Sequence, residues 1–548
     1  MKFTVLLLFV FTGCSNNLLG DLKSKKEKPH TANYWYYQDP VDDQVPGIGL
    51  YKLHKSVKQV AYQKVIVAIL DTGIDIHQPD LKNQFWINND EVVKNNLDDD
   101  ANGYIDDIYG WNFLGGVNKD TRTFAHFSAI RFLKKYRTAY QEILKKKQFG
   151  KKDKWLISEY QRALNDSIAE QEFLKRRKKY KKWYDNTQRQ ADSLLATTYN
   201  IQSPYKLKTI DSLFTLVYHH QKDETRARLI YFILDVLKNN RVQGYRQNKE
   251  IIAKSLAYSL NEKYVEKPGL NDNPIIKYGN GRIYTNYKMT SHCTEVAGAI
   301  AAHSTNNFGG GGVFDKAKIM ILQITPEIGS DHEKDLANAI YYAVNNGAKV
   351  INYSSSINFI CTPDLVYDAL RYAEKKDVLF ITSAGNKGLD LDKTITHPRN
   401  NYQDKPLSNF IMVGASDSIN NNKLKPIWSN YGKHTIDLFA PGVNFLTTWP
   451  DETYKKSTGS SISAAVVSGS AACLRAAFPN LSANDIKNCL LTTVTKYKTP
   501  VQLVKTDSLS HKPFNELSVS GGILNVHEAF QKAKLLSVEK ESSNILKD

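Results

Sequence analysis

Five short runs of apolar residues stand out along the chain, and β-branched side chains are frequent in them. They begin at Val65, Lys318, Ala348, Val378 and Phe410. A continuous apolar run of this length is typical of a strand buried on both faces, as in a parallel sheet. Segments with helical spacing of apolar residues lie between the runs, for example at 335–347 and 364–376. Strands alternating with helices predict an α/β fold, a parallel sheet with helices on both faces.

The segment from residue 120 to residue 266 breaks this alternation. It has almost no Gly or Pro, and its apolar residues recur at helical spacing. Two stripes of apolar side chains are formed by Leu133, Tyr136, Tyr140 and Leu144, and by Leu156, Tyr160, Leu164 and Ile168. Such stripes predict several long helices, packed as a bundle or a hairpin, and hence an inserted all-α helical subdomain.

The net charge of the chain is concentrated in this insertion. The chain carries a formal charge of +17, and between residues 118 and 270 Lys and Arg exceed Asp and Glu by 17. The most basic stretch, Leu174 to Tyr184, interleaves Lys and Arg with aromatic residues. A contact with an anionic surface or a nucleic acid is one interpretation, and a solvated helix face with aromatic side chains packed beneath it is the more common one. We therefore expect no nucleic-acid partner.

The N-terminus has the pattern of an export signal. Lys2 precedes an apolar run over residues 3–11, which is too short to span a membrane. The run ends in a Phe-Thr-Gly-Cys sequence at Cys14, which resembles a bacterial lipobox, where the cysteine is lipidated and becomes the mature N-terminus. We expect an exported lipoprotein anchored to the membrane at Cys14, on its periplasmic or cell-surface side, with simple secretion as the alternative.

Three polar residues occupy positions that suit catalysis. Asp71 ends the first predicted strand and Gly73 follows it, which places a carboxylate at the crevice where open α/β sheets hold their sites. His292 opens an apparent helix of small residues, and Ser461 follows Gly459 at the start of another. Each position alone also fits a structural role: a turn carboxylate, a structural histidine and a tightly packed helix.

In the order Asp, His, Ser, these stretches resemble the subtilisin-like serine peptidases (subtilase family, peptidase S8). The stretches AILDTGIDIHQPDL, TSHCTEVAGAIAA and STGSSISAAVVSGS are similar to the family patterns D-[ST]-G, H-G-T-H-V-A-G and G-T-S-M-A-x-P. The block IWSNYGKHTIDLFAPG is similar to a family block before the nucleophile, and SVSGGILNVHEAF to the usual end of the catalytic domain. The resemblance implies a serine endopeptidase that hydrolyses polypeptide substrates through an acyl-enzyme intermediate.

The resemblance also implies a role for each residue. His292 is the base, Asp71 orients its imidazole, and Ser461 attacks the peptide carbonyl. Asn386, within VLFITSAGNKG, stands where the family has its oxyanion-hole asparagine. The substrate-binding residues that it implies are Tyr353, Ser354, Ser355, Ser356 and Gly385.

Several positions depart from the family pattern. Cys293 stands where a glycine is usual, Glu295 replaces the second histidine, and Ser356 replaces a common glycine. None of these changes removes a member of the triad. They leave open the alternative of a catalytically inactive subtilisin-like binding or scaffold lipoprotein.

An acidic loop follows the first motif. Asp98, Asp100, Asn102 and Asp106 stand at positions 1, 3, 5 and 9 of an EF-hand-like pattern, and Gly103 stands at position 6. The usual Glu at position 12 is missing, and a solvated acidic loop is the alternative interpretation. Because crowded carboxylates need a cation to balance them, we expect calcium here and no organic cofactor.

The sequence thus predicts a catalytic domain interrupted by an insertion. The predicted parts are a lipoprotein signal peptide (1–14), a linker (15–34), the first part of a subtilisin-like catalytic domain (35–117), the basic helical subdomain (118–270), the second part of the catalytic domain (271–536) and a disordered tail (537–548).

Overall fold

The computed structural model of the 548-residue chain describes residues 34–57, 60–115, 121–203, 206–221, 223–238, 254–263, 278–284, 290–304, 309, 311–504 and 509–545. The signal peptide and Cys14 predicted from the sequence lie outside these ranges. The described residues form two compact units. The larger unit contains the residues up to Thr123 and from Tyr278 onward, and the smaller unit those from Phe124 to Lys263.

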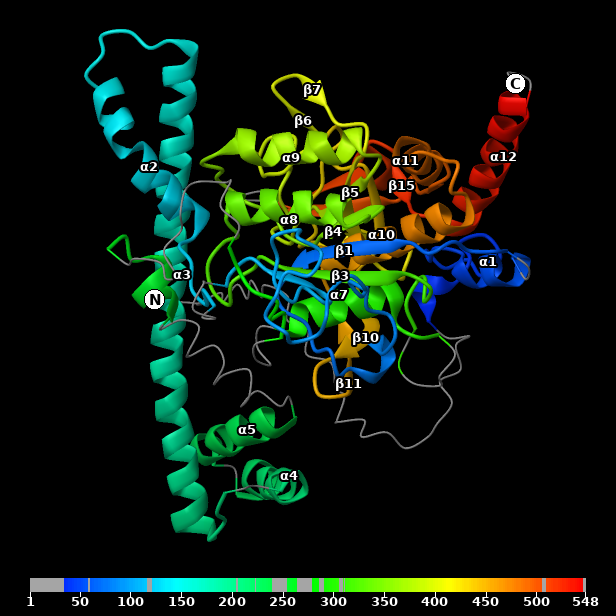
Figure 1. Ribbon diagram of the computed structural model, residues 1–548. Helices are drawn as coiled ribbons and strands as arrows, with labels where there is room; N and C mark the ends of the chain where they lie inside the picture. The colour runs from blue at the N-terminus through cyan, green and yellow to red at the C-terminus, as the bar shows by residue number, and fades with distance from the viewer. Residues whose placement is uncertain are drawn as a thin grey trace. The chain divides into compact units, whose positions relative to one another are not determined.

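A nine-stranded sheet forms the centre of the larger unit (Figure 1). Its order is β12-β15-β9-β8-β5-β4-β1-β3-β2, and every neighbouring pair is parallel except β12 and β15. The strands are β1 (Ile66–Asp71), β2 (Gly110–Asn112), β3 (Lys318–Gln323), β4 (Val350–Tyr353), β5 (Leu379–Ser383), β8 (Phe410–Ser416), β9 (Leu438–Pro441), β12 (Thr495–Lys496) and β15 (Gly522–Ile523). The five predicted apolar runs form β1, β3, β4, β5 and β8, so the predicted parallel α/β sheet is confirmed.

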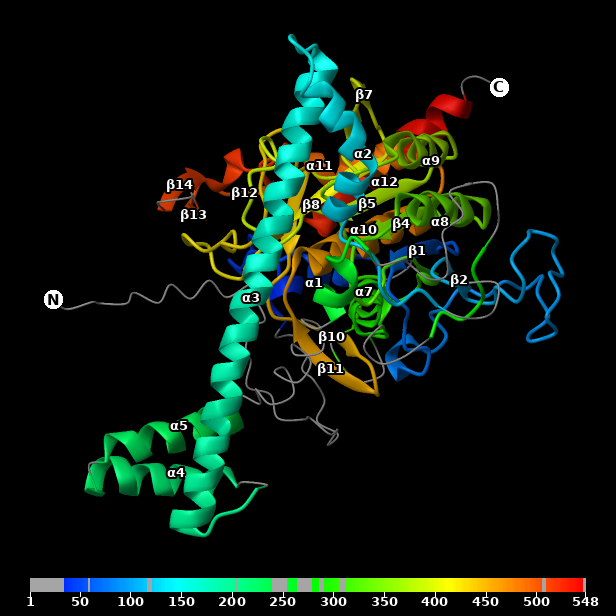
Figure 2. The same cartoon turned by 90° about the vertical axis from the view of Figure 1, so that its left-hand side faces the viewer.

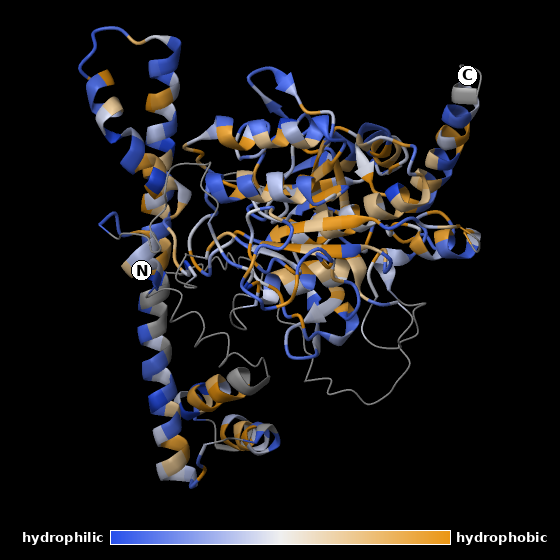
Figure 3. Cartoon of the chain, in the orientation of Figure 1, coloured by the Kyte–Doolittle hydropathy of each residue, from blue (hydrophilic) through white to orange (hydrophobic). Residues whose placement is uncertain are grey.

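Helices cover both faces of this sheet. One face carries α1 (Leu50–Ser56), α7 (Ser291–Ala301), α10 (Ser460–Ala477), α11 (Ala483–Thr492) and α12 (Val526–Ile545), and the other carries α8 (Glu333–Asn345) and α9 (Pro363–Lys375). Because side chains alternate along a strand, Val67 and Ile69 of β1 pack into the first layer, and Ala68 and Leu70 into the second. Burial on both faces explains the continuous apolar run, which Figure 3 shows as hydrophobic colour along the central strands.

The remaining short elements of the larger unit lie outside the sheet. They are the 3₁₀ turns at Trp35–Tyr37, Pro79–Leu81 and Phe514–Glu516, and the two-stranded pairs β6 (Asn401–Tyr402) with β7 (Lys405–Pro406), β10 (Phe445–Trp449) with β11 (Thr453–Ser457), and β13 (Pro500–Val504) with β14 (Leu509–Pro513). In the described part of the chain, no helix combines the length and apolar character needed to cross a membrane.

A buried ion pair lies where the chain leaves the larger unit for the insertion. Arg122 pairs with Asp335 at the start of α8, and both side chains are almost fully buried. The Tyr278 hydroxyl donates to the same carboxylate. Arg122, which the sequence analysis assigns to the insertion, therefore belongs structurally to the larger unit, and the smaller unit begins at Phe124.

The end of the chain differs from its prediction. Residues 537–545, predicted as part of a disordered tail, continue α12. Ser537 donates to the side chain of Asn480 (2.9 Å), and Lys540 pairs with Asp485 of α11. These contacts hold the polar last turns of α12 against α11 and the residues just before it. The amino-acid composition of the tail alone does not predict them.

The smaller unit is helical, as its apolar spacing predicts. It contains α2 (Ser128–Ile143), α3 (Lys151–Tyr199), α4 (Leu207–Thr215), α5 (Glu224–Lys238) and π-helical turns at Leu216–Gln221 and Ser255–Ser259. Within this unit, α2 packs beside one end of α3, and α4 and α5 pack near the other (Figure 2). At 1.5 Å per residue, the 49 residues of α3 span about 73 Å.

The apolar stripes of the smaller unit pack against one another. The rings of Tyr140 and Tyr160 stack with centroids 4.0 Å apart, and Leu133 and Leu156 are buried. The stripes end earlier than predicted, because Leu144 is 52% exposed and Ile168 is 57% exposed. The insertion thus supplies its own core.

Candidate active site

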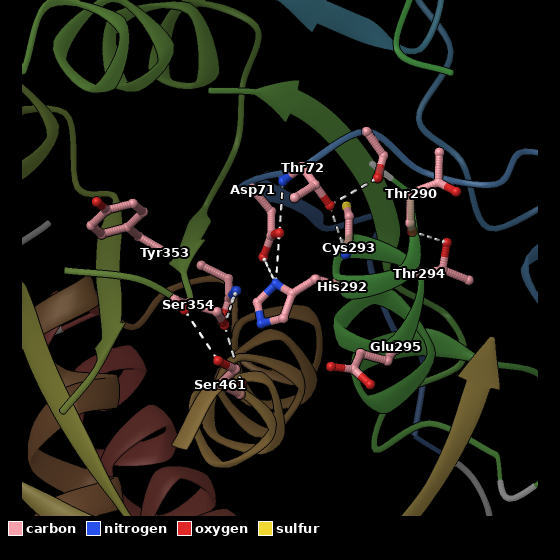
Figure 4. A network of polar contacts seen from close by, with 12 residues as sticks. Asp71, Thr72, Thr290, His292, Cys293, Thr294, Glu295, Tyr353, Ser354 and Ser461 are labelled. Atoms are coloured by element: carbon pink, nitrogen blue, oxygen red, sulfur yellow. Dashed lines mark hydrogen bonds and ion pairs between the residues drawn. The ribbon is translucent and has the colours of Figure 1, made fainter. Parts of the chain in front are cut away.

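Asp71 and His292 meet where a strand ends and a helix begins. Asp71 is the last residue of β1, and His292 lies in the first turn of α7. The imidazole Nδ1 lies 2.7 Å and 2.8 Å from the two carboxylate oxygens of Asp71 (Figure 4). Asp71 is 3% exposed and also accepts from the backbone N–H of Thr72 (2.6 Å). The buried carboxylate therefore fixes both the orientation of the ring and the tautomer that carries its proton on Nδ1.

The surroundings of His292 favour its protonated form. Burial has the largest single effect and lowers the pKa of the imidazole, but the charge and hydrogen bonding of Asp71 raise it, and so do the nearby carboxylates of Glu295 and Asp331. Together they raise the pKa of His292 from its usual 6.5 to about 9. A base in this position can hold a proton taken from a neighbouring hydroxyl.

Ser461 lies at the start of α10, and Figure 4 shows the imidazole of His292 between Asp71 and Ser461. The Ser461 hydroxyl donates to the backbone oxygen of Ser354 (3.2 Å), and the Ser354 hydroxyl donates to the backbone oxygen of Ser461 (3.1 Å). The serine must turn from this carbonyl toward the imidazole before its proton can move. Its place at a helix N-terminus favours negative charge on a bound carbonyl oxygen.

Asn386 lies beside the same helix start. Its side-chain oxygen accepts from the backbone N–H of Ser460 (2.9 Å), which leaves the amide nitrogen directed elsewhere. A Cβ built on Gly459 would lie 3.4 Å from that nitrogen, so the donor faces the backbone just before Ser461. The Ser461 backbone nitrogen lies 3.9 Å from the same point, so these two N–H donors lie close to each other.

Asn430, which the sequence analysis missed, holds the turn that carries Asn386. Its amide nitrogen donates to the Ala384 backbone oxygen (2.7 Å), and its amide oxygen accepts from the N–H groups of Lys387 (3.1 Å) and Leu389 (2.8 Å). Gly385 sits beneath it at φ 95°, and a Cβ there would lie 2.8 Å from the Asn430 amide nitrogen. The turn therefore requires glycine at 385. The signal was present in IWSNYGKHTIDLFAPG, which contains Asn430.

Of the four residues predicted at the end of β4 and just after it, three lie near Ser461 or are accessible. Ser354 contacts Ser461 directly, and Ser355 and Ser356 are partly exposed. Tyr353 is different: its ring is fully buried and its hydroxyl donates to Asp331 (2.7 Å). Because alternate side chains point to opposite faces of a strand, the Tyr353 side chain packs under α8 and α9, and we remove it from the substrate-binding prediction.

Two of the departures from the family motif, Cys293 and Glu295, are buried beside His292 in α7. Cys293 is fully buried in the core, its backbone N–H donates to the Thr72 hydroxyl (3.1 Å), and burial raises the pKa of its thiol. Glu295 is also buried, and its carboxylate accepts from Ser457 (2.7 Å). Neither side chain takes a position that Asp71, His292 or Ser461 occupies.

The carboxylates that cluster in the acidic loop differ from the predicted ligands. Carboxylate oxygens of Glu91, Asp100 and Asp107 all lie within 4.8 Å of one another, and only Asp100 was predicted. Asn102 donates its amide N–H groups to Asp100 (2.9 Å) and Asp107 (3.1 Å), while its amide oxygen accepts from the N–H of Tyr104 (2.7 Å). The amide oxygen of Asn102 therefore does not face the carboxylates.

The other two predicted ligands carry unsatisfied oxygens. Asp98 and Asp106 each have one buried carboxylate oxygen without a hydrogen-bond partner in the described part of the chain. Burial raises the pKa of Glu91 and of Asp107, since a charged carboxylate loses water there. Oxygen atoms left without donors and several close carboxylates are what a hard cation such as Ca²⁺ would satisfy.

A family model and several known proteins match this chain. Residues 62–507 match the model of the subtilase family. The chain is 32% identical over 204 residues to subtilisin Savinase of Lederbergia lenta, covering 37% of this chain and 70% of that protein. It is 33% identical over 205 residues to thermitase of Thermoactinomyces vulgaris, covering 37% of this chain and 67% of that protein. The aligned part spans only 50% of an alkaline protease of Shouchella clausii, at 32% identity.

Among solved structures, the chain is similar to the prenylagaramide maturation protease PagA, with a TM-score of 0.36 and 24% identity over 45% of this chain and 83% of that one. The family match covers most of the chain and includes Asp71, His292 and Ser461. The chain belongs to the subtilase family of serine endopeptidases.

Proposed function

We propose that this chain is an active serine endopeptidase that uses Asp71, His292 and Ser461 as its catalytic triad. The observation that carries the proposal is the doubly hydrogen-bonded pair of Asp71 and His292, placed beside a serine at the start of α10. The Asn386 amide, oriented by the Ser460 N–H, supplies the remaining group that acyl transfer needs. Its substrates are polypeptides, in keeping with the family.

The reaction follows from these positions. His292 accepts the hydroxyl proton as Ser461 Oγ bonds to the peptide carbonyl carbon, and the Asp71 carboxylate stabilises the imidazolium. Asn386 Nδ2 and the Ser461 N–H hold the negative oxygen of the tetrahedral intermediate. His292 then gives its proton to the leaving amine as the C–N bond breaks, which leaves an acyl-enzyme. Water, deprotonated by His292, attacks the ester and releases the carboxylic acid.

Export and lipid anchoring at Cys14 belong to the same proposal and rest on the sequence of residues 1–14. The apolar run after Lys2 and the lipobox-like ending are the support for it. The enzyme would then act outside the cytoplasm, on the periplasmic or cell-surface side of a membrane. What supports activity over the catalytically inactive alternative is that Asp71 and His292 are hydrogen-bonded even though Cys293 and Glu295 depart from the family pattern.

A second part of the proposal is a structural calcium ion in the acidic loop. Glu91, Asp100 and Asp107 would hold it, with the unsatisfied oxygens of Asp98 and Asp106 as further donors. The ion would supply positive charge that offsets the mutual repulsion of the carboxylates and so stabilise the loop. It takes no part in the reaction.

Replacement of the nucleophile should abolish hydrolysis. We expect Ser461→Ala to lower kcat on a peptide substrate by about 10⁶-fold. Asn386→Ala should lower kcat by about 10²–10³-fold with little change in KM, because its donor acts on the intermediate. Ser408→Ala is the matched control. This exposed serine lies just before the start of β8, whereas Asp71 lies at the carboxyl end of β1, and the change should leave kcat unchanged. Unchanged hydrolysis by Ser461→Ala would exclude the proposed nucleophile.

The pH dependence of kcat/KM should report on His292. Only the neutral imidazole can accept the proton of Ser461, so kcat/KM should rise with pH through the pKa of His292. The midpoint of this rise should lie above the usual 6.5, toward about 9. Glu295→Gln removes one of the charges that raise this pKa and should move the midpoint to lower pH. A wild-type midpoint at or below the usual histidine value would contradict the described environment.

Calcium should protect the fold. At a hundredfold excess over its Kd, a ligand that binds only the native state adds about 2.7 kcal/mol of stability. We expect a melting temperature several degrees higher in calcium than in chelator, measured on the Ser461→Ala protein to prevent self-digestion. Asp100→Asn should remove most of this difference, whereas Asp404→Asn, the same change at an exposed position, should not. Equal melting temperatures with and without calcium would rule the site out.

A further inference from the structure

The turn between α2 and α3 is a densely basic surface of the smaller unit. Between residues 144 and 155 six lysines accompany a single acidic residue, Asp153. The lysines are Lys145, Lys146, Lys147, Lys151, Lys152 and Lys154, and all are exposed. Asp153 pairs with Lys146 (2.8 Å), so a net positive charge of 5 remains in 12 residues. We call residues 144–155 the hairpin tip.

Apolar side chains stand exposed among these lysines. Leu144 is 52% exposed, Phe149 is 40% exposed and Trp155 is 51% exposed. Phe149 lies in the turn itself, and Leu144 and Trp155 lie where α2 ends and α3 begins. A turn that needed only solubility would gain nothing from three large apolar side chains in water.

The combination has a specific physical meaning. Lysine side chains are attracted to negatively charged surfaces. Each lysine close to an anionic bilayer raises the affinity of the protein for that bilayer about fivefold. Tryptophan and phenylalanine side chains are favoured at the boundary between lipid headgroups and acyl chains. Their apolar rings contact the acyl chains there, and the polar N–H of tryptophan remains near water. Leu144, an aliphatic side chain, gains from contact with acyl chains but has no stacking partner on a nucleic acid.

We propose that the hairpin tip is a docking surface for bilayers that contain anionic phospholipids. Its lysines bind the phosphate headgroups, and Leu144, Phe149 and Trp155 insert at the level of the headgroups. The proposal rests on the described residues of the smaller unit alone. It depends neither on hydrolysis nor on an acyl chain at Cys14.

The test is sedimentation of the full chain with vesicles, using Cys14→Ser so that no acyl chain contributes. The protein should bind vesicles of phosphatidylglycerol and phosphatidylcholine, but not of phosphatidylcholine alone, and high salt should weaken binding. Lys151→Gln with Lys152→Gln and Lys154→Gln should weaken binding about 100-fold. Phe149→Ala with Trp155→Ala should also weaken it, although the charge is unchanged. Thermal melting of each variant checks that it folds.

Two matched triple variants remove the same charge elsewhere. The first control variant changes three exposed lysines of the larger unit and should leave binding unchanged. Its substitutions are Lys375→Gln, Lys376→Gln and Lys405→Gln. The second control variant replaces three exposed lysines of the basic α3 stretch, as Lys175→Gln, Lys179→Gln and Lys182→Gln together. If that variant loses binding while the tip variants keep it, the docking surface is α3 and the proposal is wrong. Equal binding to neutral and anionic vesicles, or binding to duplex DNA without binding to vesicles, would likewise overturn it.

Discussion

Two hydrogen bonds between Asp71 and His292 join segments that are 221 positions apart in the sequence. They form only because β1 ends at the same edge of the sheet where α7 begins. The other side of α7 packs closely against β10. There is no room for a side chain at Gly298, because a Cβ there would lie 2.1 Å from the Thr448 hydroxyl oxygen. The catalytic geometry therefore depends on correct pairing of β1 with β3 and β4 and on close packing of α7.

The helical insertion lies between these two residues in the sequence, yet the pair forms. The insertion has its own apolar clusters, one of which joins α3, α4 and α5. A segment with its own core adds loop length between Asp71 and His292, and the entropic penalty of a longer loop grows only slowly with length. The buried pair of Arg122 and Asp335 holds the chain at the exit from the larger unit.

A second network positions the groups around the reacting serine. Ser460 binds Asn386 through its N–H and accepts from the Gly385 N–H through its hydroxyl (3.0 Å). Asn430 holds the same turn from the other side. Behind it lies Lys425, fully buried, whose ammonium donates to the backbone oxygens of Pro426 and Ser429 (both 2.8 Å). Burial lowers the pKa of Lys425 to about 7.

Much of the fold and of the candidate site could be predicted from the sequence, because both rest on local patterns. Buried parallel strands leave continuous apolar runs, and Asp71, His292 and Ser461 each stand beside a recognisable turn or helix start. What the sequence could not supply depends on contacts between distant segments. Asn430 matters through its bonds to residues 384–389, and Glu91 lies outside the spacing of the acidic loop.

Other differences arise from orientation and from packing between helices. Tyr353 is adjacent to Ser354, but strand alternation turns its ring into the core. Asn102 has the right residue type for a cation ligand, yet its amide nitrogen faces the carboxylates. The last turns of α12 are polar and resemble a tail, and only their bonds to Asn480 and Asp485 make them part of the fold.

The central claim is that Ser461 is the residue activated by His292 and Asp71. The most direct measurement is reaction of the purified protein with a fluorophosphonate, followed by mass-spectrometric mapping of the modified residue. The described geometry predicts a single phosphonylated serine at Ser461, and loss of labelling in Asp71→Asn. Labelling of Ser354 or another serine, or no labelling of correctly folded protein, would contradict the account.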